Sequence, residues 1–171
     1  MPEHVFVDES KARGLLMAAI ACPAEAVNTH RRIMAGLLMP RERRIHFTKE
    51  SPARRRKILA AIAEFGLTAR LYQADKDTIA ARRACLARMV CDIAGSAERM
   101  VIERDESTVV VDKQVLFRAA REYDCAESLR YELLAAHSDP MLWIPDAVAW
   151  SWVKGGEWRD LIAPYATLIQ V

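Results

Sequence analysis

The stretch "HVFVDES" (residues 4–10) joins a short apolar run to an abrupt acidic end. Val5, Phe6 and Val7 have the β-branched and aromatic character of a strand interior. Successive side chains of a strand point to opposite faces, so Asp8 shares a face with Phe6 while Glu9 points to the other side. The stretch therefore predicts a core strand that carries the carboxylate of Asp8 to the rim of a sheet.

The stretch "MVIERDES" (residues 100–107) repeats this pattern. Val101, Glu103 and Asp105 fall on one face of the predicted strand, and Arg104 falls on the other. Since two apolar strands each end directly in acidic residues, we expect Glu103 to lie at a sheet rim as Asp8 does.

A third acid, Asp146, lies in "LWIPDAVAWSW" (residues 142–152). On a helix it is in line with Ala149, Trp150 and Val153, so it belongs to the buried stripe of that helix, in its first turn. An acid in a first helical turn also has an ordinary explanation, because the helix dipole favours it by up to about 1 kcal/mol.

The combination of Asp8, Glu103 and Asp146 predicts a cation site. Burying several unpaired carboxylates together costs several kcal/mol unless cations neutralise them. Mg²⁺ or Mn²⁺ suits a set of oxygen donors, and two such ions held by shared carboxylates hydrolyse phosphodiesters. The hypothesis requires the three rims to converge in space.

Hydrophobic periodicity predicts a single α/β domain over residues 1–171, with a mixed sheet flanked by helices and a helical insertion after the first hairpin. The expected strands are residues 5–7, 15–21, 67–73, 100–103 and 129–136, with residues 43–50 extended. The expected helices are residues 23–38, 51–64, 77–95, 112–123 and 145–156. Residues 158–171 give no clear pattern.

Charge is distributed unevenly along the chain. Residues 31–57 contain ten Lys or Arg against Glu42 and Glu50, a net charge of +8, so the rest of this +2 chain carries −6. Such asymmetry is typical of a surface that faces phosphates, although a solvated pair of Arg-rich helices would look the same. No apolar run is long enough to span a membrane and no signal peptide is evident, so a cytoplasmic protein is expected.

Four motifs together resemble a known family: "VFVDES", "HFTKES" with the Arg-rich helix after it, "VIERDES" and "WIPDAVAWSW". In order and spacing they are similar to the actinobacterial branch of the domain-of-unknown-function 3800 family, which has a ribonuclease H-like fold. The resemblance implies a ribonuclease H-like core with Asp8 on the first strand, Glu103 on the fourth and Asp146 on the final helix. By analogy it implies metal-dependent nuclease activity. Arg44 departs from the family pattern, since many members carry an acid there.

Further candidates surround this acid set. His46 would orient a water or protonate a leaving group, or would be a structural histidine. Glu50, Glu9 or Asp105 would complete the acid cluster.

Lys49 and Arg55 would contact phosphate, or Arg55, in register with the apolar face of its helix, would pair with a rim carboxylate. The sequence thus predicts either a Mg²⁺- or Mn²⁺-dependent nuclease acting on nucleic acid or a catalytically inactive ribonuclease H-like module that binds nucleic acid or protein.

Overall fold

The hairpin predicted from residues 4–21 forms the centre of a sheet in the computed structural model, which describes all 171 residues. Strand β1 (Glu3–Ser10) pairs antiparallel with β2 (Leu15–Pro23), placing Asp8 opposite Ala18. Both edges of each hairpin strand are occupied, because β1 also pairs with β4 and β2 also pairs with β3. The hairpin is therefore fixed on every side.

The sheet has six strands in the order β5-β4-β1-β2-β3-β6. Strand β3 is antiparallel to β2, whereas β4 is parallel to β1, β5 to β4 and β6 to β3. The sheet is mixed, as expected. The remaining strands are β3 (Thr68–Ala74), β4 (Ala97–Glu103), β5 (Arg130–Leu134) and β6 (Ala166–Gln170).

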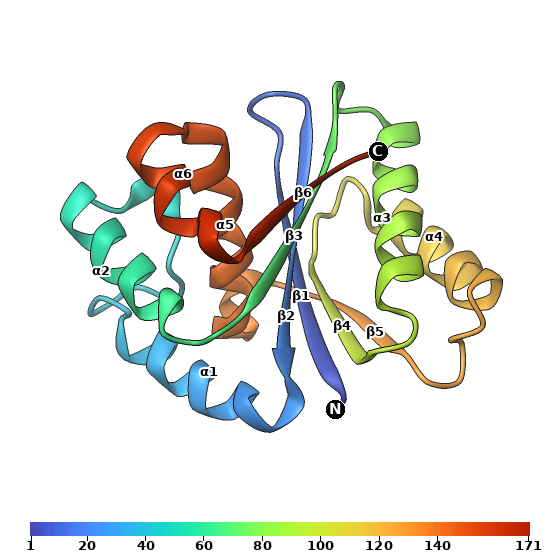
Figure 1. Ribbon diagram of the computed structural model, residues 1–171, viewed down its shortest axis with the longest axis horizontal. Helices are drawn as coiled ribbons and strands as arrows, with labels where there is room; N and C mark the ends of the chain where they lie inside the picture. Colours follow the sequence, from blue (N-terminus) through green and yellow to red (C-terminus); the bar gives the residue numbers. More distant parts are fainter.

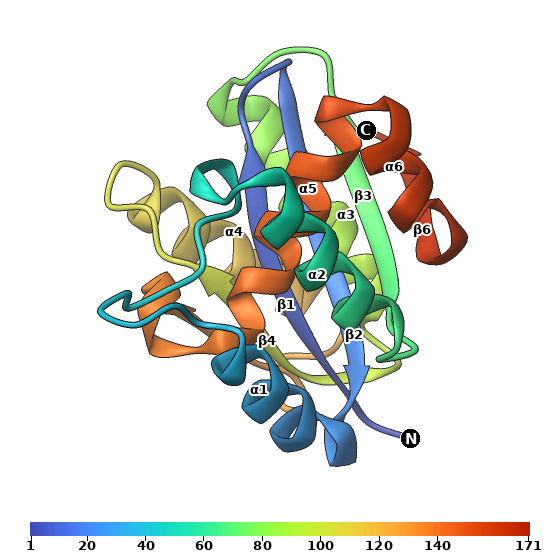
Figure 2. The ribbon, with the colours of Figure 1, turned by 90° about the vertical axis from the view of Figure 1, so that its left-hand side faces the viewer.

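Helices cover both faces of the sheet (Figures 1 and 2). One layer contains α1 (Val27–Gly36), α2 (Pro52–Ala63), α5 (Trp143–Lys154) and α6 (Gly156–Ile162), and the other contains α3 (Ile79–Ile93) and α4 (Val109–Glu122). Helices α1 and α2 form the expected insertion between the hairpin and β3. No helix combines the length and hydropathy needed to cross a membrane.

Five short 3₁₀ segments connect these elements. They are Ala24–Ala26, Phe47–Lys49, Ala136–Ser138, Pro140–Leu142 and Ala163–Tyr165. The segments Ala136–Ser138 and Pro140–Leu142 lead the chain from the end of β5 into the first turn of α5.

Two apolar cores follow from the alternation of β1. Phe6 belongs to the core under α5, whereas Val5 and Val7 belong to the core under α3 and α4. On β4, Val101 faces the α5 side as Phe6 does. The predicted face assignment is confirmed, and it directs Asp8 and Glu103 toward α5.

Residues 43–50 do not form the extended segment that their alternating pattern predicts. They form a loop that ends in the 3₁₀ turn Phe47–Lys49. Ile45 and Phe47 are fully buried, but the segment joins no strand of the sheet.

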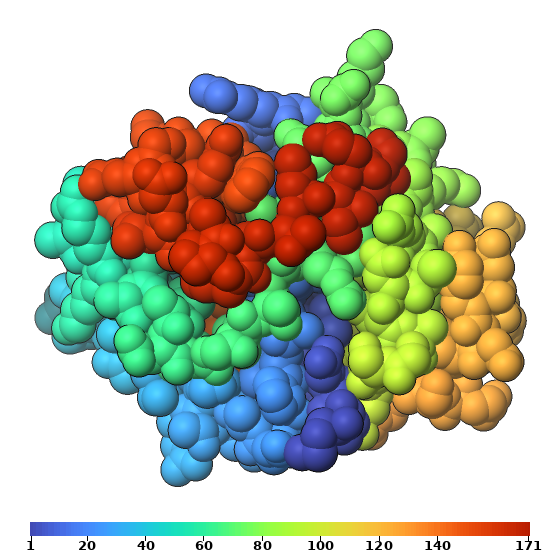
Figure 3. Space-filling view, viewed as in Figure 1, coloured from blue at the N-terminus to red at the C-terminus, as the bar shows by residue number.

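The C-terminal residues, which gave no clear pattern, complete the sheet. They form α6, a 3₁₀ turn and the edge strand β6, and they lie at the surface in red in Figure 3. Only Ile169 of β6 packs against the α3 side core, while Leu168 is exposed. A five-residue strand with no fully buried side chain has too little periodicity to be identified from sequence.

Gly14 in the β1–β2 turn generates a prediction for stability. Its φ is +73°, and an added Cβ would lie 2.6 Å from the carbonyl oxygens of Ala74 and Asp75. We expect Gly14→Ala to cost about 2–4 kcal/mol, from left-handed strain plus overpacking. Thermal unfolding should show a midpoint lower by roughly 5–15 °C.

Gly36 provides the matched control. It lies in α1 with nothing within 4 Å of an added Cβ. Gly36→Ala should leave stability unchanged or raise it by up to about 1 kcal/mol, because alanine favours a helix. Equal losses in the two variants would contradict the assigned packing of the turn.

Candidate active site

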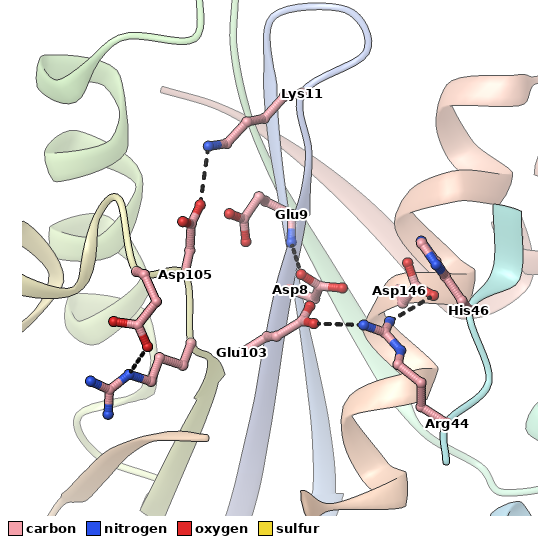
Figure 4. A pocket seen from close by; sticks show the side chains of 10 residues that line it. Asp8, Glu9, Lys11, Arg44, His46, Glu103, Asp105 and Asp146 are labelled. Carbon is pink, nitrogen blue, oxygen red and sulfur yellow. Dashed lines mark hydrogen bonds and ion pairs between the residues drawn. The ribbon is translucent and has the colours of Figure 1, made fainter. Parts of the chain in front are cut away.

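Asp8, Glu103 and Asp146 meet at one end of the sheet (Figure 4). Asp8 lies near the end of β1 and Glu103 is the last residue of β4; these parallel neighbours are in register, with Val7 opposite Ile102. Helix α5 packs on β1 and β2 and carries Asp146 in its first turn. The three acidic ends converge as the sequence hypothesis requires.

The acids open into a cavity of about 530 Å³ whose lining contains no hydrophobic residue. His46 lies beside Asp146 at this cavity (Figure 4). The complete lining is Asp8, Glu9, Lys11, Arg44, His46, Glu103, Arg104, Asp105, Glu106 and Asp146. A cavity lined only by charged and ionisable groups is suited to ions rather than to an apolar ligand.

Asp8 is the most constrained of the three acids. It is 5% exposed, and its Oδ1 accepts a hydrogen bond from the backbone N–H of Glu9 at 2.8 Å. Burial raises the pKa of Asp8 well above its usual value, and a hydrogen bond with Glu103 and the negative charges of Glu103, Asp146 and Glu9 add to the rise. The protein therefore compensates the carboxylate form of Asp8 only in part, through the Glu9 N–H.

Asp146 is better compensated. Its Oδ2 accepts a hydrogen bond from the backbone N–H of Phe47 at 3.0 Å. Burial raises the pKa of Asp146, while the Phe47 hydrogen bond and the charges of Arg44 and His46 act in the opposite direction. The loop that carries Phe47 thus holds this carboxylate in place.

Arg44 bridges two of the acids. Its Nη1 lies 3.1 Å from Oε1 of Glu103, and its Nη2 lies 3.7 Å from Oδ2 of Asp146. The sequence singled out Arg44 as a departure from a family pattern but did not predict this ionic role. No local signal would have done so, because the partners are 59 and 102 residues away.

Glu9 points to the other side of the sheet, as strand alternation predicted. There Arg82 donates from Nη1 to its Oε1 at 3.0 Å and makes two hydrogen bonds to Asp112, at 2.6 and 2.7 Å. Arg82 and Asp112 are 1% and 0% exposed. Oε2 of Glu9 is buried without a partner, and the residue still lines the cavity. Burial raises the pKa of Glu9, and Arg82 opposes the rise.

Sequence reasoning missed this buried network, although one signal was available. Arg82 is in line with Leu86, Met89 and Ile93 on the inward face of α3, where a charged residue requires a partner. The sequence pattern predicts a helix that starts at Asp112, but α4 begins at Val109, and Asp112 is buried in its first turn.

Three predicted site residues lie outside the cavity. Glu50 is ion-paired with Arg54 at 3.1 Å, so it does not join the acid set. The guanidinium of Arg55 donates to the carbonyls of Phe47 and Thr48 and lies 4.1 Å from the ring centroid of Trp150, instead of facing the cavity as a phosphate contact. Lys49 is exposed on the 3₁₀ turn. Of residues 43–50 only Arg44 and His46 line the cavity, and the 3₁₀ turn begins at the residue after His46.

Asp105 lines the mouth of the cavity. Its Oδ1 accepts hydrogen bonds from the backbone N–H and the hydroxyl of Ser107, which lower its pKa, and its Oδ2 pairs with Lys11 at 3.3 Å. Of the three acids considered for completing the cluster, Glu9 and Asp105 therefore adjoin it and Glu50 does not.

The donor chemistry of the cavity fits a divalent cation. Carboxylate oxygens are the ligands that Mg²⁺ and Mn²⁺ prefer, and the only partly compensated Asp8 lies among them. As the side chains stand, no three His, Cys, Asp or Glu form a ready-made metal site. Arg44, which pairs with two of the three acids, occupies part of the position that a cation would take.

Comparisons with known proteins identify the fold. No protein-family model matches the chain, and no curated protein matches it in sequence. Its structure is similar to that of ribonuclease HII from Archaeoglobus fulgidus, solved in complex with PCNA, with a TM-score of 0.58 and 14% identity over 86% of this chain and 70% of that one. Ribonuclease H2 from Pyrococcus horikoshii OT3 gives a TM-score of 0.54 and 10% identity with the same coverages. The expected ribonuclease H-like fold is confirmed.

The buried network on the α3 side generates a stability prediction. Arg82→Met leaves Glu9 and Asp112 buried without their cation, so we expect a loss of about 3–5 kcal/mol in urea unfolding. Arg88 of the same helix, half-exposed and paired with Asp92, is the control. Arg88→Met should leave the midpoint nearly unchanged, and a similar loss in both variants would contradict the network's importance.

The raised pKa of Asp8 predicts the pH dependence of stability in EDTA. Ionising this residue costs more in the folded than in the unfolded protein, so its unfavourable contribution grows as pH rises above about 4. Asp8→Asn removes that contribution and should raise the unfolding temperature at pH 8, by about 2–4 °C for each kcal/mol. The gain should shrink as pH falls toward 4 and disappear below about pH 3, where Asp8 is protonated in both states.

Asp105→Asn is the control of opposite sign, because the pKa of Asp105 is lowered in the folded protein. Its removal should bring no gain at pH 8. A gain for Asp8→Asn that does not change between pH 4 and pH 8 would show that charge is not its cause.

Proposed function

We propose that this protein is a divalent-metal-dependent nuclease that hydrolyses phosphodiester bonds. The observation that carries the proposal is the convergence of Asp8, Glu103 and Asp146 in one cavity lined only by ionisable side chains. These are the residues that would hold the metal. The resemblance to the domain-of-unknown-function 3800 family remains part of the proposal.

A bound Mg²⁺ or Mn²⁺ would supply an activated water and charge neutralisation at the phosphate. The chain provides the rest. His46, beside Asp146, would pass a proton to or from the reacting oxygen, because an imidazole ring can both accept and donate a proton. Glu9, with one buried oxygen free of partners, would adjoin the metal ligands.

Cationic side chains at the rim would draw a polyanion toward the acids. Lys11 and Arg104 line the mouth of the cavity, and Arg44 approaches it from the basic segment of residues 31–57. All three are ion-paired with acids of the lining, so they would turn to a phosphate backbone once a bound cation had neutralised those acids. The ribonuclease names of the two structural neighbours point to the same class of substrate.

A catalytically inactive nucleic-acid-binding module is the second candidate. It is favoured by Arg44, which neutralises part of the acid cluster and so holds it together without a metal. In that case the cavity would keep its shape but would not support hydrolysis.

A cleavage assay separates the two. With Mn²⁺ present, the wild type should cleave at least one of single-stranded, duplex and RNA–DNA hybrid substrates, and Asp8→Asn should lower the rate by more than about 100-fold, since even outer-shell residues of metal sites are worth 10–100-fold. Asp160→Asn, an exposed change on α6, is the control and should retain full activity.

The outcomes are distinct. Equal cleavage by wild type and Asp8→Asn would identify a contaminating nuclease and count against the proposal. Binding of substrate without cleavage in any metal would support the inactive module instead.

A further inference from the structure

We infer that Arg44 is an internal counter-ion that competes with the divalent cation for the acid cluster, so that a metal binds only when its guanidinium leaves. The inference rests on the proposed function, because it presumes that the cavity takes a metal. It assigns to Arg44 the control of metal affinity.

The geometry makes simultaneous occupation by guanidinium and metal unfavourable. One guanidinium contacts a carboxylate from β4 at 3.1 Å and a carboxylate from α5 at 3.7 Å. These contacts occupy one oxygen of each carboxylate, Oε1 of Glu103 and Oδ2 of Asp146, which are then not free for a metal. A guanidinium and a divalent cation bound to the same carboxylates would also repel each other, and more strongly in a partly buried site than in water.

The negative charge of the acid cluster explains why an arginine lies at position 44. Asp8, Glu103 and Asp146 crowd together, and Glu9 adds its own charge to the set. A single guanidinium neutralises part of this charge and can bind two carboxylates at once. It therefore keeps the cluster assembled when no metal is present.

Arg44 is attached in a way that permits it to leave. Apart from the two acids, its only other polar contact is a 3.4 Å hydrogen bond from Nε to the carbonyl of Ile45, its own neighbour. Its side chain is 29% exposed, and the preceding residues 39–43 are all exposed. Figure 4 shows the side chain reaching into the cavity from this loop.

Arg82 shows what a fixed arginine looks like in the same protein. It is 1% exposed, makes two hydrogen bonds to Asp112 and a third to Glu9, and lies within a helix. Arg44 has none of these constraints. Once displaced by a metal, its guanidinium would remain at the cavity wall beside His46, where a phosphodiester would provide the anion that it had lost.

The test measures Mn²⁺ binding to the full chain without nucleic acid, by electron paramagnetic resonance and calorimetry. Arg44→Gln should bind Mn²⁺ about tenfold more tightly than the wild type or better, within the 10–100-fold range by which residues around metal ligands change affinity. In EDTA it should unfold at a lower temperature, and Mn²⁺ should raise that temperature more than in the wild type.

Two further variants sharpen the measurement. Arg44→Lys keeps the charge but loses the planar fork, so its affinity should fall between those of the wild type and Arg44→Gln. Arg43→Gln removes the adjacent, exposed charge from the same loop and should leave Mn²⁺ affinity within about twofold, since an exposed charge is largely screened.

The outcomes separate this inference from the proposed function. Equal or weaker Mn²⁺ binding by Arg44→Gln, with binding still abolished by Asp8→Asn, would overturn the inference and leave the metal site standing. Absence of Mn²⁺ binding in every variant would overturn the proposed function and the inference with it.

Discussion

The structure depends on one electrostatic constraint: three carboxylates are gathered at the ends of two parallel strands and one helix, where water is scarce. Register between β1 and β4 sets Asp8 beside Glu103, and the packing of α5 on β1 brings Asp146 to them. Burial, a hydrogen bond with Glu103 and the like charges around it raise the pKa of Asp8, so a nearby cation would stabilise the cluster. One loop supplies two compensating groups from within the chain: the guanidinium of Arg44 contacts Glu103, and the backbone N–H of Phe47 donates to Asp146.

Buried acidic side chains lie on both faces of the sheet, but their charges are neutralised differently on each face. On the α3 side, Arg82 and Asp112 form a closed network with no access to solvent. On the α5 side, the acids face a cavity and have a counter-ion with few other contacts. A closed ion pair supports structure, whereas an open one can be exchanged for a ligand, and this difference is why the chemistry is assigned to the α5 side.

The sequence predicts features that follow from local patterns, but not contacts between residues that are far apart in the chain. The faces of Asp8, Glu9 and Glu103 follow from strand alternation and the position of Asp146 from helical periodicity, and both are local rules that the structure bears out. The ion pairs of Arg44 and Arg82 join residues that are distant in the chain, so no local pattern reveals them. Lys49 and Glu50 lie at a 3₁₀ turn that alternation alone predicts as extended chain, whereas the contacts of Arg55 with the carbonyls of that turn depend on its folded shape.

Asp8 and Glu9 are consecutive residues that face opposite cores, and the N–H of one donates to the carboxylate of the other. A substitution in α3 or α4 that alters how Arg82 holds Glu9 would thus shift the peptide plane on which Asp8 depends. The helices on the opposite face of the sheet from α5 therefore offer positions at which evolution or an engineer could adjust the cavity while every lining side chain stays the same.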